Sequence, residues 1–349
     1  MNAATGREQA ARHIEVIRAL SQPGQPLAPD APTASIYNPA WFNLAAPNLA
    51  PIGARKHLHE VLRAQATSAP ADHDRQAIVL AGPPGAGKST VMRQITGEMA
   101  ATFLALDADE FKIMLLDEAL RDGSYESWLK PAEVRALEAQ GERFFPLEMA
   151  SLVHEESSFL TRLAQHDALA AGINVVIDTV LSDANKALDL GRRLTQAGYS
   201  IRVIDVEVPY EVSHARIVAR WEQAYLDGLA GRAQLGGRWV PSEFTRSVFD
   251  GPGGRSCSEI AAERLAHDCP AVTRFQRFRT TVEDGQLIGP VLETDQAGDG
   301  LHLASADRAA NIGAQQMGLG PAAMGTPASQ PSEPQPPVAQ SGQAPQLGL

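Results

Sequence analysis

The chain contains little cysteine and few aromatic residues, and it has no long apolar run. Its 349 residues include only two cysteines, Cys257 and Cys269. Their spacing is not that of a metal site, and a chain of this length does not depend on a disulfide framework, so reduced thiols in a cytosol are expected. No stretch approaches the roughly 18 apolar residues of a membrane span, and residues 1–20 lack a signal-peptide core. We therefore predict a soluble, cytoplasmic protein with no membrane partner.

An excess of positive charge is also absent. The formal net charge is −11 and the isoelectric point is near 5.3. Nucleic-acid binding depends on clustered lysine and arginine, so this balance argues against a nucleic-acid partner. Local basic residues are instead expected to bind a small anionic ligand. The hydrophobic content of 44% is sufficient for a sizeable core, and the length allows about two domains.

One glycine-rich segment carries most of the functional information. Residues 82–89 read Gly-Pro-Pro-Gly-Ala-Gly-Lys-Ser, between an apolar run at 76–81 and a helix-forming stretch at 88–99. This is the Walker A pattern in the strand–turn–helix context that it requires. Its glycines turn backbone N–H groups toward an anion, its lysine reaches the β- and γ-phosphates, and its serine hydroxyl coordinates Mg²⁺. The residues predicted to bind ATP are Gly82, Pro83, Pro84, Gly85, Ala86, Gly87, Lys88, Ser89 and Thr90.

Short apolar runs and helical stretches alternate around this motif. The expected strands are 77–81, 102–106, 174–177 and 201–208, and a last pair, 273–280 and 286–292, flanks the hairpin-like turn Glu283-Asp284-Gly285. Nearly continuous β-branched runs are typical of strands buried on both faces of a parallel sheet. We predict an α/β fold, a P-loop kinase-like parallel sheet flanked by helices, in a domain that spans residues 70–294. Ligands are expected at the carboxyl ends of its strands.

Both ends of the chain differ from this domain in composition. Residues 1–69 are expected to form a helical, Pro-rich extension, and residues 295–349, rich in Gly, Ala, Gln and Pro, are predicted to be a disordered tail. The extension holds one expected helix from Thr5 to Leu20, with Thr5 and Glu8 in capping-box spacing.

A second helix of the extension is expected over 54–66. Three aromatic residues are expected to anchor the extension to the body: Tyr37, Trp41 and Phe42. The first helix either shields the nucleotide site or docks an inhibitory partner, or it is simply a packed terminal helix.

Acidic residues follow the second and third expected strands. Residues 107–112 read Asp-Ala-Asp-Glu-Phe-Lys. A carboxylate at this place can orient an acceptor hydroxyl and accept its proton, and Asp109 is the better candidate for that base, whereas Asp107 is suited to cap a helix. The third strand ends in Asp178, as in a Walker B motif, so Asp178 is expected to bind Mg²⁺ through water. Thr179 adds a hydroxyl to the metal or the substrate, or caps the next segment of the chain.

Three arginines and one polar run complete the candidates. Arg216 and Arg220 share a helix face, and Arg238 lies in a glycine-flanked loop. One arginine on a transferring phosphoryl group can contribute about 10³ to 10⁵ in rate. From their positions alone, Arg220 and Arg238 either contact the transferring phosphoryl group or are ordinary surface residues. Arg216 is expected to be solvated or paired with a carboxylate. The run His-Glu-Glu-Ser-Ser at 154–158 is either a solvated helix face or a substrate-binding segment, since no second histidine completes a metal site.

In order and spacing, these segments resemble the zeta toxin family of bacterial P-loop kinases, which phosphorylate UDP-N-acetylglucosamine and thereby poison the supply of cell-wall precursors. The resemblance covers about residues 75–290. It rests on the ordered series Gly-Pro-Pro-Gly-Ala-Gly-Lys-Ser, Asp-Ala-Asp-Glu-Phe-Lys, His-Glu-Glu-Ser-Ser, Asn-Val-Val-Ile-Asp-Thr, Arg-Trp-Glu and Gly-Arg-Trp-Val-Pro.

The resemblance implies a function and residue roles. Lys88 and Ser89 would hold ATP and Mg²⁺, and Asp109 would activate the sugar 3′-hydroxyl of UDP-N-acetylglucosamine. Arg220 and Arg238 would contact phosphate. The predicted substrate contacts are Asp107, Lys112, Glu156 and Thr179, of which Glu156 is similar to the family's substrate-contacting acid. A protein antitoxin is a partner that the resemblance allows, and the sequence does not decide whether one exists.

Two alternatives stay open on the sequence. The acceptor can be another hydroxyl compound, such as a nucleoside, an antibiotic or a polynucleotide end, although the acidic net charge argues against the last. The chain can also be a non-catalytic ATP-binding regulatory module. Asp109 distinguishes the second alternative from a kinase, because a regulatory module does not need a hydroxyl-activating base.

Overall fold

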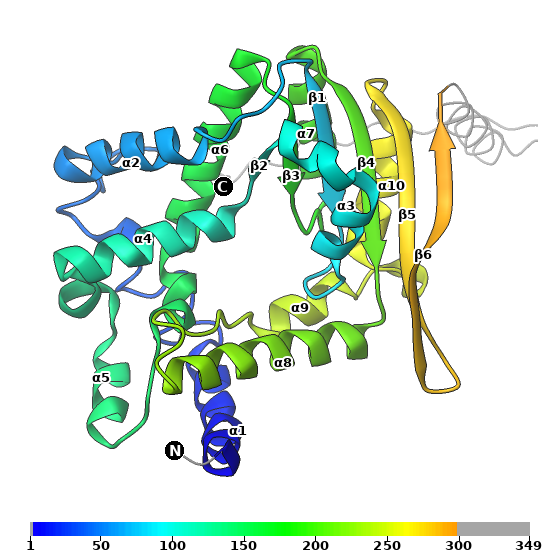
Figure 1. Cartoon of the computed structure of the whole chain (residues 1–349). Helices are drawn as coiled ribbons and strands as arrows, with labels where there is room; N and C mark the ends of the chain where they lie inside the picture. Colours follow the sequence, from blue (N-terminus) through cyan, green and yellow to red (C-terminus); the bar gives the residue numbers. More distant parts are fainter. Residues whose placement is uncertain (1–2, 299–349) are drawn as a thin grey trace, which may run out of the picture. The chain divides into compact units, whose positions relative to one another are not determined.

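The computed structural model describes residues 3–298 (Figure 1), and the predicted tail lies outside the described residues except for its first four positions. One sheet of six strands, in the order β2-β3-β1-β4-β5-β6, organises this part of the chain. The first five strands are parallel, and β6 runs antiparallel to β5. The strands are β1 (Gln76–Ala81), β2 (Leu104–Leu106), β3 (Val175–Asp178), β4 (Ser200–Glu207), β5 (Val272–Glu283) and β6 (Gln286–Ala297).

Ten α-helices lie within residues 3–298. They are α1 (Ala3–Leu20), α2 (Gly53–Ala66), α3 (Lys88–Thr96), α4 (Ala108–Asp122), α5 (Ala132–Ala139), α6 (His154–Ala171), α7 (Ala184–Gln196), α8 (Tyr210–Leu229), α9 (Ser242–Val248) and α10 (Cys257–Asp268). Helix α3 is shorter than predicted, because the chain continues as the 3-10 segment Gly97–Thr102. The predicted α/β fold is confirmed, and every expected strand forms, with shifts of up to five residues at its ends.

The alternation of side chains along each strand explains why the sheet is covered on both faces. Val79 of β1 belongs to the larger apolar cluster, whereas its neighbours Ile78 and Leu80 belong to the smaller one. The same alternation separates Val175 and Val176 in β3. Because successive side chains of a strand point to opposite faces, each strand contributes to two cores. Both faces of the sheet therefore need helices.

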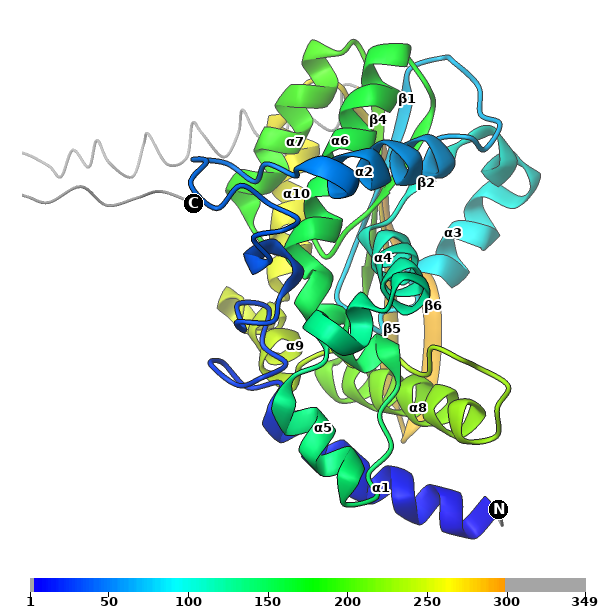
Figure 2. The same ribbon diagram turned by 90° about the vertical axis from the view of Figure 1, so that its left-hand side faces the viewer.

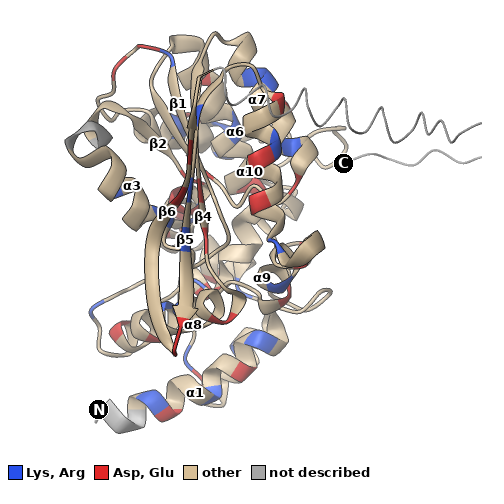
Figure 3. Ribbon diagram, turned by 90° about the vertical axis from the view of Figure 1, so that its right-hand side faces the viewer, with Lys and Arg blue, Asp and Glu red and all other residues tan. Residues whose placement is uncertain are grey.

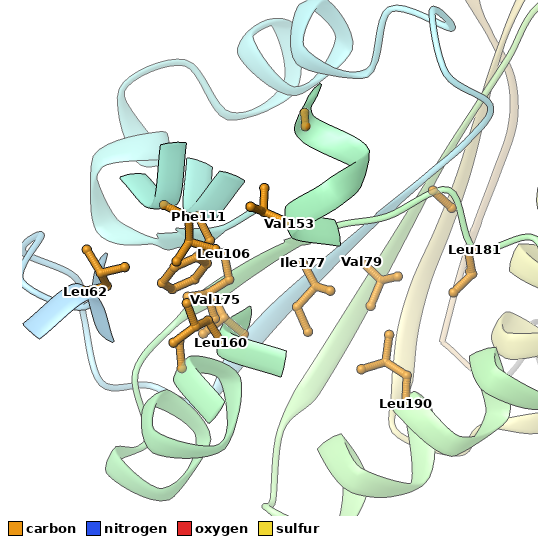
Figure 4. Packing of buried hydrophobic residues seen from close by; sticks show 14 of the residues in the cluster. Leu62, Val79, Leu106, Phe111, Val153, Leu160, Val175, Ile177, Leu181 and Leu190 are labelled. Carbon is orange, nitrogen blue, oxygen red and sulfur yellow. The ribbon is translucent and has the colours of Figure 1, made fainter. Parts of the chain in front are cut away.

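Figure 3 views the sheet on edge, with α3 on one side and α7 and α10 on the other. The larger cluster also includes α4 and α6, and Figure 4 shows Phe111 and Leu160 from these helices against Leu106 and Val175 of the strands. Phe111 is 2% exposed, and complete burial of such a side chain contributes about 1.5 to 3 kcal/mol. These contacts hold the start of α4, which carries the acidic motif, against the end of β2.

The hairpin between β5 and β6 forms where the sequence predicts it. Glu283 pairs with Gln286, and the two residues between them, Asp284 and Gly285, both have positive φ values, 48° and 75°. Two consecutive left-handed residues are typical of the tight turn that joins antiparallel strands. Strand β6 continues to Ala297, five residues beyond the predicted end.

The N-terminal extension packs on the body and shares its core. Helix α1 begins at Ala3, so Thr5 lies inside the helix and the predicted capping box with Glu8 is wrong. Alanine is the strongest helix former, and Ala3 and Ala4 extend the helix past the expected cap. Figure 2 shows α1 alongside α8, and Ile17 of α1 is completely buried. This is the arrangement expected of a packed terminal helix.

Of the three predicted aromatic anchors, Trp41 packs against the main hydrophobic core, and Phe42 is buried beside His59 of the extension. Phe42 is 2% exposed, and Trp41 lies under the guanidinium of Arg55 at 4.1 Å from its ring centroid. Tyr37 is 42% exposed and is the least buried of the three, so its anchoring role stays a prediction. It ends the short 3-10 turn that starts at the buried Ser35.

Two further sequence predictions concern cysteine and membranes. Cys257 and Cys269 flank the ends of α10 and are both free thiols. A helix of this length separates its ends by about 18 Å, far beyond the reach of a disulfide between them. Among residues 3–298, no helix combines the length and the apolar character needed to cross a bilayer.

Candidate active site

The phosphate-binding motif forms a tight turn between β1 and α3. Gly82 and Gly85 have φ values of 141° and 73°, which favour glycine. A Cβ atom on Gly82 would lie 2.2 Å from the Val206 carbonyl oxygen, and one on Gly85 would lie 2.7 Å from that of Ser213. The turn therefore approaches β4 and α8 more closely than any side chain permits. Ser89 and Thr90 are exposed in the first turn of α3, whose N-terminal amides favour an anion.

Helix α8 holds this turn through two side chains. The Ser213 hydroxyl donates to the Pro84 carbonyl at 2.6 Å, and Nη1 of Arg216 donates to the carbonyls of Gly85 and Ala86 at 3.1 and 3.2 Å. The expectation that Arg216 is solvated or paired with a carboxylate is wrong, because its guanidinium binds backbone oxygens instead. Sequence reasoning missed Ser213. The signal was its three-residue spacing from Arg216, which places both residues on the face of α8 that meets the turn.

Lys88 and Asp178 meet where β1 and β3 end. Nζ of Lys88 donates to the Gly82 carbonyl at 3.0 Å and lies 3.5 Å from a carboxylate oxygen of Asp178. Burial raises the pKa of Asp178, Lys88 opposes the rise, and the carboxylates of Asp107 and Asp109 add to it. The carboxylates that follow β2 and β3 therefore influence one another beside the phosphate-binding turn.

Thr179 is engaged in a local turn. Its backbone N–H donates to the Leu80 carbonyl at 3.0 Å, and its Oγ1 accepts from the N–H of Leu181 at 3.1 Å. Of the predicted alternatives for Thr179, the structure places its oxygen as a cap on the following turn. The hydroxyl proton is still free to be donated, so a substrate contact stays a prediction.

The acidic motif after β2 places its two carboxylates in different environments. Asp107 is the N-cap of α4 and accepts from the N–H of Asp109 at 2.9 Å. Asp109 is paired with Arg238 through both carboxylate oxygens, at 2.9 and 2.8 Å, and with Nζ of Lys112 at 2.9 Å. Burial alone would raise the pKa of Asp109, but Arg238 and Lys112 outweigh it and hold that pKa below its usual value. Asp109 is therefore ionised at neutral pH.

Arg220 joins this group from α8. Although Arg220 is exposed, partial desolvation of its guanidinium lowers its pKa, the neighbouring Arg238 lowers that pKa further, and Asp109 opposes the change. The side chains of Arg220, Arg238 and Asp109 thus share one electrostatic neighbourhood, although they come from a helix, a loop and the start of another helix. Lys112 is only 7% exposed, and in this structure its ammonium group forms an ion pair with Asp109.

Glu156 does not join the group. Its side chain is completely buried and accepts from Nε and Nη2 of Arg55 at 2.6 and 2.7 Å, with Nε2 of His59 at 2.6 Å from the same carboxylate. The expected substrate contact is contradicted by this geometry, because α2 covers the carboxylate and occupies both of its oxygens. Its neighbours His154 and Glu155 keep about half of their side-chain surface exposed, as expected of a solvated helix face.

His154 is a site neighbour for which sequence reasoning gave no role of its own. Partial desolvation of its half-exposed ring lowers its pKa, and Lys112 and Arg238 lower that pKa further. The imidazole of His154 is therefore neutral at pH 7, close to the cations around Asp109.

A comparison with protein families matches the description "Zeta toxin" over residues 59–127 and 133–277, which is more than half of the chain. The chain belongs to the Zeta toxin family. A search of curated protein sequences found no match to it.

Several solved structures are similar to this chain. A complex of AvrRxo1-ORF1 and AvrRxo1-ORF2 with sulphate ions shares 19% identity at a TM-score of 0.49, covering 76% of this chain and 75% of that one. The same pair with ATP shares 19% identity at a TM-score of 0.49 and covers 77% and 75%. A structure from the PezAT chromosomal toxin–antitoxin system of Streptococcus pneumoniae shares 13% identity at a TM-score of 0.44 and covers 75% and 94%.

Membership of the Zeta toxin family supports an ATP-dependent phosphotransferase. The donor set near the turn is suited to a Mg²⁺ that arrives with phosphates. Among residues 3–298, no cluster of three or more His, Cys, Asp or Glu side chains is arranged to hold a metal, whereas Asp178 and the exposed Ser89 hydroxyl lie beside the phosphate-binding turn. Mg²⁺ at kinase sites is commonly held by one or two protein oxygens together with substrate phosphates and water. The residues present therefore fit this ion.

Proposed function

We propose that the protein is a kinase that transfers the γ-phosphoryl group of ATP to the sugar 3′-hydroxyl of UDP-N-acetylglucosamine. The observation that carries this proposal is the pairing of Asp109 with Arg238 beside Arg220, at the strand ends that also carry the phosphate-binding turn. A nucleotide-binding module without transfer activity has no need of an ionised carboxylate framed by two arginines at this place.

The donor half of the site would bind the triphosphate. The amides of residues 82–90 would surround the β- and γ-phosphates, and Lys88 would leave Asp178 to reach them, because a phosphate bears more charge than one carboxylate. Ser89 and Asp178 would hold Mg²⁺, which supplies charge neutralisation between the β- and γ-phosphates when bound. Ser213 and Arg216 keep the turn rigid, so the backbone donors need little rearrangement.

The acceptor half would orient the hydroxyl. Asp109 is a weak base because Arg238 and Lys112 lower its pKa, and phosphoryl transfer through a loose transition state needs orientation and late acceptance of the proton more than a strong base. Each carboxylate oxygen has two acceptor sites, so Asp109 can accept from the sugar hydroxyl while its pair with Arg238 persists. Arg220 and Arg238 would stabilise the charge that develops on the transferred group.

Local charge and family membership both favour a UDP-sugar as the acceptor. A UDP-sugar is an anion, and Lys112, Arg220 and Arg238 concentrate positive charge in a protein with a net charge of −11. Asp107, Lys112 and Thr179 remain the proposed contacts, with Asp107 and Lys112 acting through Asp109. We further propose a protein antitoxin as the cellular partner, a proposal that rests on the family alone.

The test is a product analysis. Purified protein is incubated with ATP, Mg²⁺ and a panel of UDP-sugars, nucleosides and free sugars, and products are examined by mass spectrometry. We expect UDP-N-acetylglucosamine to gain one phosphoryl group with the wild type and to stay unchanged with Lys88→Ala. Phosphorylation of another compound in preference would replace the proposed acceptor, and absence of any product while ATP binds would favour a regulatory module.

A further inference from the structure

Helix α1 places an imidazole at the centre of an aromatic group formed by residues far along the chain. His13 is completely buried. Its ring lies nearly parallel to that of Tyr225 at 4.8 Å between centroids and to that of Trp221 at 6.0 Å, and it meets the edge of Phe144 at 4.6 Å. Helix α1 is therefore attached to α8 by a polar aromatic residue in addition to its aliphatic side chains.

Both nitrogen atoms of His13 face carboxylates. Nδ1 is 3.1 Å from Glu142 and Nε2 is 3.2 Å from Glu148. An imidazole donates to two acceptors only when both nitrogens carry protons. Burial alone would lower the pKa of His13, but Glu148 and Glu142 outweigh it and raise that pKa. The carboxylates and the Tyr225 ring are the ionisable groups in contact with this imidazole.

Glu148 joins three separate segments. Besides His13, its carboxylate accepts from Nε1 of Trp221 at 3.1 Å and from the backbone N–H of Phe145 at 2.8 Å. It is 2% exposed, so these bonds are shielded from water and each contributes more than a comparable bond at the surface. The position of Trp221 is thus fixed by a carboxylate that His13 itself holds.

Trp221 in turn contacts the loop that carries Arg238. Its ring meets that of Trp239 edge to face, at 5.7 Å between centroids and an interplanar angle of 82°. A Cβ atom on Gly237 would lie 2.8 Å from the Trp221 carbonyl oxygen, so the backbone of the loop lies directly on α8. Arg220 immediately precedes Trp221, and Arg238 lies between Gly237 and Trp239. Trp221 is therefore next to Arg220 in the chain and contacts both residues that flank Arg238.

We propose that His13 is a positioning residue for phosphoryl transfer, which sets the places of Arg220 and Arg238 through Glu148 and Trp221. The N-terminal helix is then part of the active machinery and not a removable shield. The kinetic consequence rests on the proposed function. A misplacement of about 1 Å can reduce a rate about 100-fold, so His13→Ala is expected to lower kcat roughly 10- to 100-fold. The KM for ATP stays nearly unchanged, because Ser213 and Arg216 hold the phosphate-binding turn from the first two turns of α8.

Ile17→Ala is the matched control. Ile17 is four residues further along the same face of α1 and is also completely buried, so its truncation weakens the packing of the helix while the contacts of His13 with Glu142 and Glu148 stay in place. We expect both variants to lose thermal stability and only His13→Ala to lose kcat. His13→Gln keeps one N–H donor for Glu148 and is expected to recover part of the rate. Equal kcat values for His13→Ala and Ile17→Ala at equal folded fraction would overturn the proposal.

Limited trypsin digestion separates this inference from the proposed function. Cleavage after Arg232 and Arg238 reports on how firmly the loop is held and needs no nucleotide. We expect cleavage there to be several-fold faster in His13→Ala than in Ile17→Ala. If the wild type transfers no phosphate but this difference in cleavage is observed, the proposed function fails and the positional role of His13 stands. If the two variants are cleaved equally fast, the positional role of His13 fails. Should His13→Ala not fold, the same comparison is made with His13→Gln.

Discussion

The replacement Glu156→Gln separates a structural role from a substrate-binding role at one residue. Pairing with Arg55 and His59 lowers the pKa of Glu156 to about 2, although its burial acts in the opposite direction. A carboxyl whose pKa falls from 4.5 to about 2 on folding contributes about 3 kcal/mol to the free energy of unfolding at neutral pH, since one pKa unit corresponds to about 1.4 kcal/mol. Removing one partner of a buried ion pair costs about 3 to 5 kcal/mol. The pKa shift and the cost of breaking the ion pair therefore predict a similar loss of unfolding free energy.

The sign of the pH dependence follows from the direction of the shift. Because the pKa of Glu156 is lower in the folded state, its contribution is complete above about pH 4.5 and is lost as the pH falls toward 2. The difference in unfolding free energy between wild type and Glu156→Gln should therefore be about 3 kcal/mol at pH 7 and smaller by about 1 kcal/mol at pH 3.5. Urea titrations followed by tryptophan fluorescence measure this difference at each pH.

Glu155→Gln provides the control for this experiment. Glu155 is adjacent in sequence but its side chain is half exposed, so the replacement should change the unfolding free energy by less than about 0.5 kcal/mol. The KM for the acceptor should be the same in wild type and in the folded fraction of Glu156→Gln. Unchanged stability together with a tenfold rise in that KM would refute the reasoning and return Glu156 to the substrate site.

Three other replacements test the phosphate-binding turn. Lys88→Ala should abolish phosphate transfer and any growth arrest on expression, and persistent arrest would remove the kinase explanation of toxicity. Gly85→Ala should weaken ATP binding at least tenfold by calorimetry, since its Cβ would lie 2.7 Å from a carbonyl oxygen. Gly24 has a similar φ of 75° but open space around it, so Gly24→Ala is the control and should leave ATP binding unchanged. Arg216→Gln removes charge-assisted bonds to two carbonyls, which are worth about 1.5 to 3 kcal/mol each, and should raise the KM for ATP more than tenfold; an unaltered KM would contradict its assigned role.

The strands and the turn could be predicted because their signals are local. Apolar runs such as 175–177 are nearly continuous, and the glycines at 82 and 85 have positive φ values that the motif requires. The hairpin at Asp284 and Gly285 was predicted for the same reason, since turn preferences depend on neighbouring residues alone. Asp107 was also correctly expected to cap a helix.

Contacts between distant segments could not be read from the sequence. The partners of Glu156 are 101 and 97 residues away, and the pair between Arg238 and Asp109 spans 129 residues. Arg216 was misassigned because its acceptors are backbone carbonyls, and these leave no signature in residue types. The role of α1 was left open because its amphipathic pattern indicates a buried face without indicating that α8 covers it.

Parallel measurement of ATP affinity and phosphate transfer in Asp109→Asn tests most directly whether the carboxylate and the two arginines act on a phosphate held at Lys88. The wild type and the variant should bind ATP with dissociation constants within about threefold of each other, because the phosphate-binding turn is unaltered. Transfer to UDP-N-acetylglucosamine should fall by about 10² to 10⁴, the usual effect of removing a general base. Transfer at the wild-type rate in this variant would contradict the assignment of the active site.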